Sequence, residues 1–512
     1  MIVRRFLPFV MVLAAFVALA LFEQDYLWAA QEQSLFLHTP LFFSQCMTVS
    51  GGLLSWAGAF LTQFFYHPLL GAAVLCLLWA LLMLLLKQAF SIPWSRLWLT
   101  LVPVAMLLLT VVDLGYWIFF LKLRGHLFVA TLGFIMVALT VWLFRLLPQK
   151  VWLQTVVIVV SAVVGYPLFG FYGLLSTLLM SLLPASSRPG WLTRFVVAVG
   201  CVGVVPLACY YLCYHQTPLA NIYFTALPVF VHNGISDTWK NVPYVVIVLW
   251  MVALSLRKAL PMKVFPLSVL MGNGVKWFVV AALIVTVFLG WYKNDNFHRE
   301  LSMRRSLEQL DWEAMLSTFQ RAKGEPTRAM CMMKNLALHR TARLMKDYKL
   351  YREGFSRPDA PFPVRNVHTV GKVLYMQFGL PNYCYRWCME DGVEYGWTIE
   401  ELKLMAKCSL LNGEKVAAQR YFSLIKKTTF HYAEMKRYER LLRQPEFIGR
   451  YAEFNGIVPL LRDDDFLTSD QSQLEPFLIE HLASAPGLTP DQRELASFCY
   501  SLYFKRFRYV EK

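Results

Sequence analysis

The residues best suited to chemistry in the first half of this chain are five acidic side chains set in an otherwise apolar stretch. They are Glu23, Asp25, Glu32, Asp113 and Asp237, whereas the whole sequence has 33 acidic residues. A carboxylate close to hydrocarbon is costly, so such residues often mark a functional site. A carboxylate can remove a proton from a hydroxyl group or hold a divalent metal ion. This group is therefore the candidate site.

The composition identifies the environment in which these residues act. The chain has 512 residues, of which 57% are hydrophobic. That is too apolar for one soluble globule and predicts an all-α, polytopic helical membrane domain. The domain covers 1–292, and a soluble α-helical domain at 293–512 carries the other 28 acidic residues (33 − 5). The net charge of +16 is expected of a membrane protein that keeps Lys and Arg in its cytoplasmic loops. No basic segment of the sequence indicates a nucleic-acid partner.

Nine apolar runs approach the length that a bilayer requires of a helix. They occupy 6–22, 68–86, 97–121, 126–147, 151–166, 167–184, 191–213, 242–256 and 275–292. The stretch 51–66 is predicted to be an extracytoplasmic amphipathic or re-entrant helix and not a full span. Gly165, Tyr166 and Pro167 are predicted to break 151–184 into two short or kinked helices.

The basic residues orient these spans, because Lys and Arg favour cytoplasmic loops. Arg4 and Arg5 place the N-terminus in the cytoplasm. Further Lys and Arg residues mark four loops that are all cytoplasmic if nine helices cross. The domain at 293–512 then emerges on the outer side, which is the periplasm of a diderm bacterium. We therefore expect a protein of the bacterial inner membrane with a periplasmic C-terminal domain.

Lys122 and Arg124 depart from this rule, because they fall in a short loop that the nine-span arrangement places outside. Two interpretations are open. Either the span count is off by one, or these cations stay outside because they bind an anion. A leaving phosphate group is an anion that Lys122, Arg124, His126 or Lys240 could stabilise.

The layout of the first 120 or so residues resembles the GT-C class of integral-membrane glycosyltransferases. The resemblance is carried by an acidic pair after the first span, a long outer loop at 23–50, the apolar segment 52–68 and the later acid Asp113. It implies transfer of a sugar from a polyprenyl-phosphate donor to an extracytoplasmic acceptor. Asp25 would be the base or the ligand of a divalent metal ion, supported by Glu23, and Asp113 would be the second acid. The whole chain also resembles multi-pass membrane proteins of Bacteroidota.

Each of these residues also has a structural interpretation. Glu23 and Asp25 can simply end a helix in the headgroup region, and Asp113 can be a hydrogen-bonded residue that holds helices together. A proton relay through Asp113 is less favoured, because 1–292 shows no internal repeat of the kind found in transporters. The main alternative is a non-enzymatic scaffold whose periplasmic helical repeats bind a protein partner.

The second half of the chain has a helical pattern throughout. The clearest unit is a predicted helix at 398–411, a turn at Asn412-Gly413 and a partner helix that begins at Glu414. Small residues followed by aromatic residues at helical spacing make this pair TPR-like. Further helices are predicted after Asp311, at Glu325-Pro326, and over 432–442 and 494–504.

Two other motifs in this half are assigned structural roles. Cys384 and Cys388 are four residues apart, which matches neither a CxxC redox motif nor a zinc site. They are interpreted as packing residues, with a disulfide as the alternative. The acidic run at 463–465 resembles a metal site, but three adjacent residues cannot face one ion on a helix, so a solvated loop and helix cap is predicted.

Overall fold

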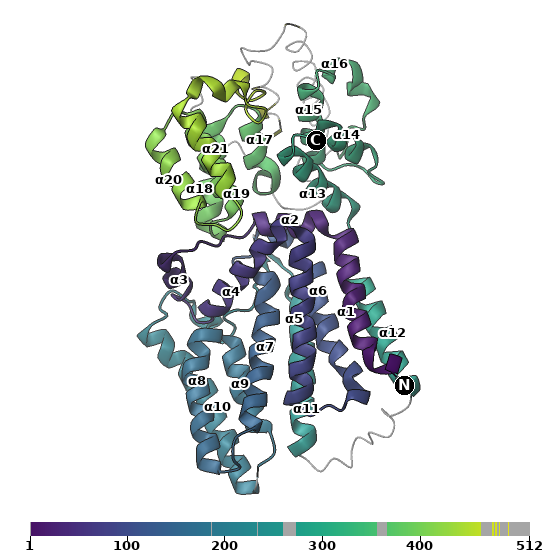
Figure 1. Cartoon of the computed structure of the whole chain (residues 1–512), viewed down its shortest axis with the longest axis vertical. Helices are drawn as coiled ribbons and strands as arrows, with labels where there is room; N and C mark the ends of the chain where they lie inside the picture. The colour runs from purple at the N-terminus through teal and green to yellow at the C-terminus, as the bar shows by residue number, and fades with distance from the viewer. Residues whose placement is uncertain are drawn as a thin grey trace. The chain divides into compact units, whose positions relative to one another are not determined.

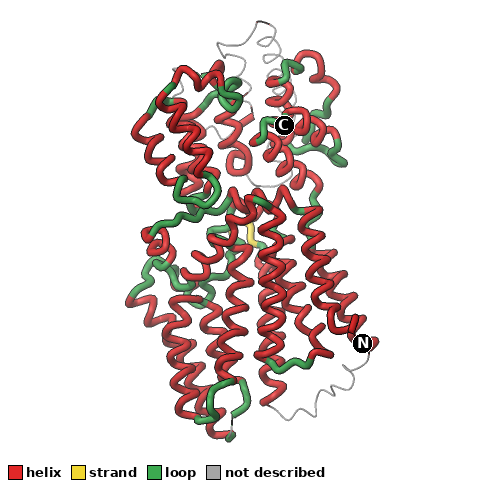
Figure 2. The backbone as a smooth tube through the Cα atoms, viewed as in Figure 1, coloured by secondary structure: helices red, strands yellow, loops and turns green. Residues whose placement is uncertain are grey.

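The computed structural model describes residues 2–185, 187–232, 234–259, 273–355 and 366–461, together with 474, 475, 477, 478, 481 and 490. The chain divides into two compact units, Met1–Tyr292 (unit 1) and Lys293–Lys512 (unit 2). About 76% of the described residues are helical, which confirms the predicted all-α class. The strands β1 (Val231–His232) and β2 (Ile235–Ser236) form one short antiparallel pair (Figure 2).

Unit 1 is built from long apolar helices that lie side by side (Figure 1). Its α-helices are α1 (Ile2–Phe22), α2 (Gln24–Glu32), α3 (Pro40–Cys46), α4 (Gly52–Thr62), α5 (Pro68–Ala89), α6 (Leu101–Val112), α7 (His126–Arg145), α8 (Val151–Phe169), α9 (Phe171–Leu182), α10 (Arg188–Leu212), α11 (Val242–Ala259) and α12 (Asn273–Gly290). Short 3-10 turns are η1 (Gln63–Tyr66), η2 (Trp94–Thr100), η3 (Gly115–Phe119), η4 (Leu219–Asn221) and η5 (Thr238–Asn241).

Six segments of unit 1 are long and apolar enough to cross a membrane. They are α5, η2 with α6, α7, α8, α10, and η5 with most of α11. The number rises to eight if two bent helix pairs, one of them α1 with α2, each count as one span. Helix α9 is apolar but has only 12 residues. These lengths and compositions support a multi-pass membrane protein.

The structure refines two parts of the predicted span arrangement. The segment 51–66 forms the 11-residue helix α4 followed by the turn η1, which is too short for a full span. The break in 151–184 lies at Gly170 and not at the predicted Gly165–Pro167. Pro167 is accommodated inside α8, whereas Gly170 has φ 57° and ψ −129°, a conformation essentially confined to glycine.

Close helix contacts and buried hydrogen bonds hold the core of unit 1 together. The Trp79 indole of α5 is fully buried and its Nε1 donates to Thr131 Oγ1 of α7 at 3.0 Å. Helices α8 and α9 approach so closely that a Cβ atom on Gly173 would lie 2.3 Å from the Gly165 carbonyl. Glycine is required at that contact, because any side chain would separate the two helices.

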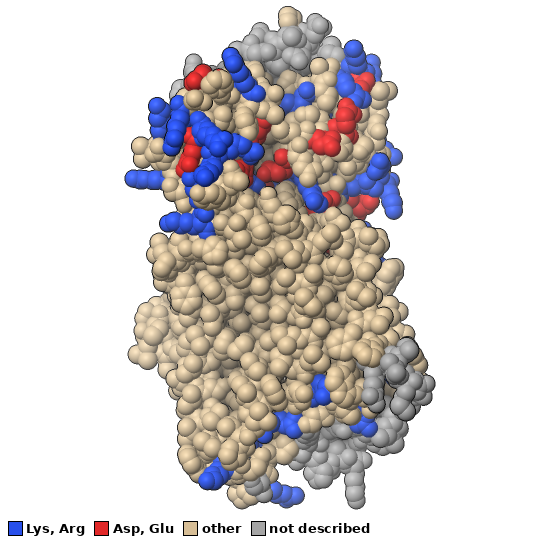
Figure 3. Space-filling view, in the orientation of Figure 1, with Lys and Arg blue, Asp and Glu red and all other residues tan. Residues whose placement is uncertain are grey.

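Basic side chains close helix ends in unit 1. Arg145 Nη1 donates to the carbonyls of Gln88 (2.8 Å) and Ala89 (2.7 Å), which are left without intrahelical donors at the end of α5. Arg194 is fully buried; it donates to the Leu183 carbonyl at the end of α9 at 2.5 Å and to Gln154 Oε1 at 2.8 Å. On the face drawn in Figure 3, unit 1 shows a wide uncharged belt, with Lys and Arg at the end where α7 meets α8.

The described helices of unit 2 are shorter and more polar. They are α13 (Asp295–Glu308), α14 (Trp312–Gln320), α15 (Arg328–Arg340), α16 (Leu344–Asp347), α17 (Lys372–Gln377), α18 (Pro381–Tyr395), α19 (Ile399–Leu411), α20 (Lys415–Ile425) and α21 (Tyr432–Arg443). The remaining turns are η7 (Tyr348–Leu350), the π-helical η8 (Val367–Gly371), η9 (Pro445–Arg450) and η10 (Val458–Leu460).

The helix pair expected around Asn412-Gly413 is present as α19 and α20, with Gly413 at φ 72° in the turn. Thr398 and Glu401 form a reciprocal capping box at the start of α19. One predicted start is displaced: the helix expected at Glu325-Pro326 begins at Arg328. Thr327 caps it, because the Thr327 hydroxyl accepts a hydrogen bond from the Met330 amide.

Several charged side chains of unit 2 are buried in pairs. The Lys372 ammonium lies 2.8 Å from Asp391 Oδ2 and 3.2 Å from Glu401 Oε1, and all three side chains are almost inaccessible to water. Cys384 and Cys388 are buried beside each other without a disulfide, as their interpretation as packing residues requires. The acidic run at 463–465 and the helix predicted at 494–504 lie outside the described residues.

Candidate functional site

Glu23 lies at a sharp corner of unit 1. Helix α1 ends at Phe22 and α2 begins at Gln24, with a bend of 80° between the two. The Glu23 side chain is buried, and Trp291 Nε1 donates a 2.6 Å hydrogen bond to Glu23 Oε1. This bond joins the corner to the residue that follows α12, which lies 268 positions away in the sequence.

Asp113 follows the last residue of α6 and is paired with a cation from a distant loop. Lys240 Nζ lies 3.2 Å from Asp113 Oδ1, and it also donates to the Asp113 backbone carbonyl. Burial raises the pKa of the Asp113 carboxyl above its ordinary value; the neighbouring Asp237 acts in the same direction, and Lys240 opposes both. The ammonium of Lys240 is thus held where negative charge is already present.

Asp237 belongs to the same neighbourhood through Trp117. The Trp117 Nε1 donates to Asp237 Oδ2 at 2.8 Å, and the Trp117 ring meets Phe230 edge to face at 5.6 Å. His232 stacks on Phe120 with ring centroids 4.3 Å apart. The turn η3 and the residues after it therefore pack against the loop before α11 through both a hydrogen bond and aromatic contacts.

Two further hydrogen bonds join residues close to Glu23 and Trp291 with residues close to Asp113. The Tyr26 hydroxyl of α2 donates to the Val111 carbonyl at 2.7 Å, and the Tyr292 amide donates to the Val112 carbonyl at 3.1 Å. Both carbonyls belong to the last turn of α6, next to Asp113. The structure thus gathers Glu23, Asp113, Asp237 and Lys240 at one end of unit 1. This set is called the carboxylate cluster below.

Asp25 and Glu32 both lie on α2, the helix that begins at this corner. Asp25 is half-buried in the first turn of α2, directly before Tyr26. Glu32 is buried at the last residue of the helix. Asp25 is thus the most accessible of the three acidic residues next to α1.

The other predicted cations occupy a different position from Lys240. Lys122 is exposed, and the Arg124 guanidinium lies over the Phe42 ring of α3 at 5.4 Å. His126 begins α7, with its Nε2 atom buried and no hydrogen-bond partner among the described residues. Gly125 makes this arrangement possible: its φ is 63°, and a Cβ atom there would lie 2.2 Å from the backbone of α4. The cation beside Asp113 is Lys240, whereas Arg124 packs on the α3–α4 side.

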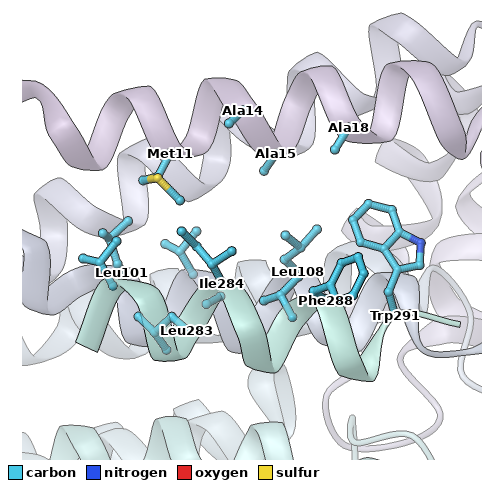
Figure 4. A pocket seen from close by; sticks show the side chains of 14 residues that line it. Met11, Ala14, Ala15, Ala18, Leu101, Leu108, Leu283, Ile284, Phe288 and Trp291 are labelled. Atoms are coloured by element: carbon cyan, nitrogen blue, oxygen red, sulfur yellow. The ribbon is translucent and has the colours of Figure 1, made fainter. Parts of the chain in front are cut away.

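An apolar pocket of about 260 Å³ lies between α1, α6 and α12 of unit 1. In Figure 4, Met11 and three alanines of α1 face Ile284, Phe288 and Trp291 across it. Its remaining lining consists of Leu101, Val104, Ala105, Leu108, Val280, Leu283 and Val287. The α12 side runs from Val280 to Trp291, roughly 16 Å at the helical rise, or about half of a bilayer's hydrocarbon core.

The pocket reaches the carboxylate cluster through Trp291. The indole ring lines the pocket, while its N–H group binds Glu23. The sequence interpretation missed Trp291, Tyr26 and Trp117 as polar partners of the acids. Their signal was present, because each is an aromatic donor placed at or near the end of an apolar run.

The residues were also compared with the requirements of a metal ion. Among the described positions, no three His, Cys, Asp or Glu side chains lie close enough together to hold one. Glu23 is bonded to Trp291 and Asp113 to Lys240. These residues therefore do not fit a metal site, whereas the role of a base asks for one accessible carboxylate, such as that of Asp25.

Comparison with other proteins gives one positive result. No curated protein and no solved structure matches the chain. A protein-family model described as a family of unknown function, DUF6057, matches residues 1–487. That match extends through unit 1 and most of unit 2, so the chain belongs to the DUF6057 family.

Proposed function

We propose that this protein is a membrane glycosyltransferase that moves a sugar from a polyprenyl-phosphate donor to an acceptor on the outer side of the membrane. The observation that carries the proposal is the apolar pocket that ends at the carboxylate cluster. A lipid-linked donor combines a hydrocarbon chain with a polar reacting end. The apolar pocket suits the hydrocarbon chain, and the adjoining carboxylate cluster suits the polar reacting end.

In this proposal Asp25 removes the proton from the acceptor hydroxyl. The acceptor oxygen then forms a bond to the anomeric carbon, and the carbon–oxygen bond to the phosphate breaks with its electron pair on the phosphate. Glu23, fixed by Trp291, supports the site, and Asp113 keeps Lys240 in position. Lys240 neutralises the charge of the departing phosphate. Lys122, Arg124 and His126 contribute from the adjoining loop.

The location of the site forms part of the same proposal. The N-terminus is cytoplasmic, and the carboxylate cluster and unit 2 are on the periplasmic side of an inner membrane. The Lys and Arg residues at the loops that follow α5 and α7 support this orientation. The helix pairs of unit 2, which we describe as TPR-like, would present the acceptor or a protein partner.

The decisive experiment replaces Asp25 with Asn, which keeps the shape of the side chain and removes its basicity. In a strain that lacks the natural gene, the variant should insert normally and fail to restore the glycan profile. The matched control is Gln24→Ala, one position away, where only a bond to the Ala20 carbonyl is lost. A normal glycan profile with Asp25→Asn would refute the proposed base.

A second candidate function has its own supporting observation. The carboxylates of Glu23, Asp113 and Asp237 are each bonded to a neighbouring side chain, which is also how purely structural acids behave. In that case the protein is a non-enzymatic scaffold, and unit 2 recruits a protein partner. Removing 293–512 should then abolish co-purification of that partner, while Asp25→Asn leaves it unchanged.

A further inference from the structure

The surface of unit 2 around α20 and α21 is unusually basic. Residues 412–450 contain nine Lys and Arg side chains and four Glu side chains. Eight of the nine basic residues are exposed: Lys415, Arg420, Lys427, Lys436, Arg437, Arg440, Arg443 and Arg450. Figure 3 shows blue side chains gathered over the part of unit 2 where Figure 1 labels these two helices.

Three of the four basic residues of α21 share one side of the helix. Tyr432, Lys436, Arg440 and Arg443 follow one another at intervals of three or four residues and are all exposed. The opposite side carries Met435, Tyr438, Leu441 and Leu442, which are buried in unit 2. Helix α21 therefore packs one face into the core of unit 2 and exposes the other, basic face to a partner.

Helix α20 extends this surface. Val416, Arg420, Ser423 and Lys427 are exposed at helical spacing along its outer side. The Lys426 ammonium lies 5.6 Å from the Tyr432 ring and Lys436 lies 5.3 Å from the same ring, so the start of α21 adjoins the end of α20. The turn η9 adds the exposed Phe447, with Arg450 over its ring. These residues of α20, α21 and η9 are called the basic face below.

The basic face combines positive charge with exposed apolar groups. Val416, Tyr432 and Phe447 are 65%, 49% and 41% exposed, respectively. Tyrosine and phenylalanine are favoured at the boundary between headgroups and hydrocarbon, and clustered Lys and Arg are attracted to anionic lipids. A simple solvated charged surface would have no need of three exposed apolar side chains among its cations.

The connection between the two units is short. Helix α12, an apolar segment of unit 1, ends at Gly290, and unit 2 begins at Lys293. With α12 in a bilayer, a connection this short would tether unit 2 to that bilayer and raise its effective concentration there, so each individual lipid contact could be weak.

We propose that the basic face of unit 2 binds the anionic headgroups of a phospholipid bilayer. Lys436, Arg440 and Arg443 contact the phosphate groups, and Tyr432 and Phe447 rest at the level of the headgroups. This inference is independent of whether the protein transfers sugars, because it uses none of the residues of the carboxylate cluster.

The test uses the full chain in lipid nanodiscs, with a photo-crosslinking amino acid in place of Tyr432. Lipid captured by the crosslinker is measured by mass spectrometry in neutral phosphatidylcholine discs and in discs that also contain phosphatidylglycerol. We expect roughly ten-fold more lipid captured in the anionic discs, and a large loss in 1 M salt, where screening shortens the reach of charges to about 3 Å.

Charge-reversal variants make the test specific. The triple variant Lys436→Glu, Arg440→Glu, Arg443→Glu should abolish the preference for anionic discs. A matched triple variant elsewhere in unit 2, Arg321→Glu, Lys346→Glu, Lys349→Glu, also reverses three exposed charges and should leave it intact. Equal capture in both kinds of disc, or capture of a protein or glycan in place of lipid, would overturn the proposal.

Discussion

At the scale of single residues, each acid of the carboxylate cluster contacts a side chain that lies far away in the sequence. Glu23 is matched with Trp291, Asp113 with Lys240 and Asp237 with Trp117. Glu23 is buried and Asp113 and Asp237 are half-buried, so an unpaired charge at these positions carries a desolvation cost that a donor offsets. The strength of each pair can therefore be measured by removing one partner at a time.

Replacing Trp291 with Phe should destabilise unit 1, because Glu23 loses its indole donor and stays buried. A hydrogen bond to a charged group contributes about 1.5–3 kcal/mol. Thermal unfolding in detergent should show a lower midpoint for Trp291→Phe and little change for the control Trp152→Phe, whose indole is exposed on α8. Equal midpoints in the two variants would contradict a stabilising Glu23–Trp291 bond.

Breaking the Asp113–Lys240 pair should cost more than removing it altogether. Lys240→Met leaves the Asp113 carboxyl without its cation, and the loss of a buried partner typically costs about 3–5 kcal/mol. Adding Asp113→Asn to Lys240→Met should restore part of this stability, as measured by thermal unfolding in a double-mutant cycle. Additive losses would show that the two residues act independently.

At the scale of secondary-structure elements, glycines decide where the helices of unit 1 can bend and meet. Gly170 ends α8 with a positive φ and separates it from α9. A Cβ atom at this position would lie 2.7 Å from the Thr225 carbonyl. The amide of Phe171 also donates to that carbonyl at 3.0 Å, so the α8–α9 corner is bonded to the loop before α11.

Gly170→Ala should therefore destabilise unit 1 by about 1–3 kcal/mol, through backbone strain and the collision with Thr225. The control is Gly203→Ala in α10, where no atom lies within 4 Å of the added Cβ. Alanine favours helix more than glycine does, so that change should be neutral or slightly stabilising. Thermal unfolding of the two variants compares them directly. A Gly170→Ala midpoint equal to that of Gly203→Ala would refute the strained corner.

In unit 2, a buried ion cluster of Lys372, Asp391 and Glu401 joins α17, α18 and α19. Burial alone would raise the pKa of the Asp391 carboxyl, but Lys372 and His368 together bring it below its ordinary value. Burial raises the pKa of Glu401, and Lys372 offsets part of that rise. The low pKa of Asp391 contributes stability above its unfolded pKa, and acid removes that contribution as the pH falls through the folded pKa.

Lys372→Met should reverse this dependence on pH. Without the ammonium, Asp391 and Glu401 remain buried side by side, and the folded pKa values of both carboxyls rise above their unfolded values. The variant should then be about 3–5 kcal/mol less stable at pH 7 and recover as acid protonates the carboxyls. Thermal unfolding from pH 7 to pH 4 measures this. The control Lys349→Met, at an exposed position, should follow the parent protein, and a variant that weakens steadily with acid would contradict the assignment.

At the scale of the whole molecule, the distribution of charge is the main evidence for orientation. The Lys and Arg residues of the short loops lie at the ends of apolar helices, whereas three of the five acids of unit 1 belong to the carboxylate cluster and the other two lie on α2 beside it. The orientation proposed above requires the carboxylate cluster to face the periplasm.

Fusion of a reporter that is active only in the periplasm gives a direct measurement of this orientation. A fusion at Lys512 should be active, and a fusion after Lys150, between α7 and α8, should be inactive. The positive-inside bias is the physical reason for both outcomes. An inactive fusion at Lys512 with an active fusion after Lys150 would refute the nine-span arrangement and with it the proposed location of the site.

The sequence by itself determined the helical class, the apolar segments of unit 1 and the α19–α20 pair. These depend on local information: runs of apolar residues, caps such as Thr398 and turns such as Asn412-Gly413. It also isolated Glu23, Asp113, Asp237 and Lys240 as unusual, because charges are rare in so apolar a stretch.

Only the tertiary structure decided which of these residues meet. The choice of Lys240 over Lys122 or Arg124 as the cation of Asp113 depends on how α6 packs beside the start of α11. The apolar pocket exists only because α1, α6 and α12 lie together, and Trp291 joins it to Glu23 across 268 positions. Such contacts leave no local trace in composition or spacing, because they are set by packing between helices far apart in the chain.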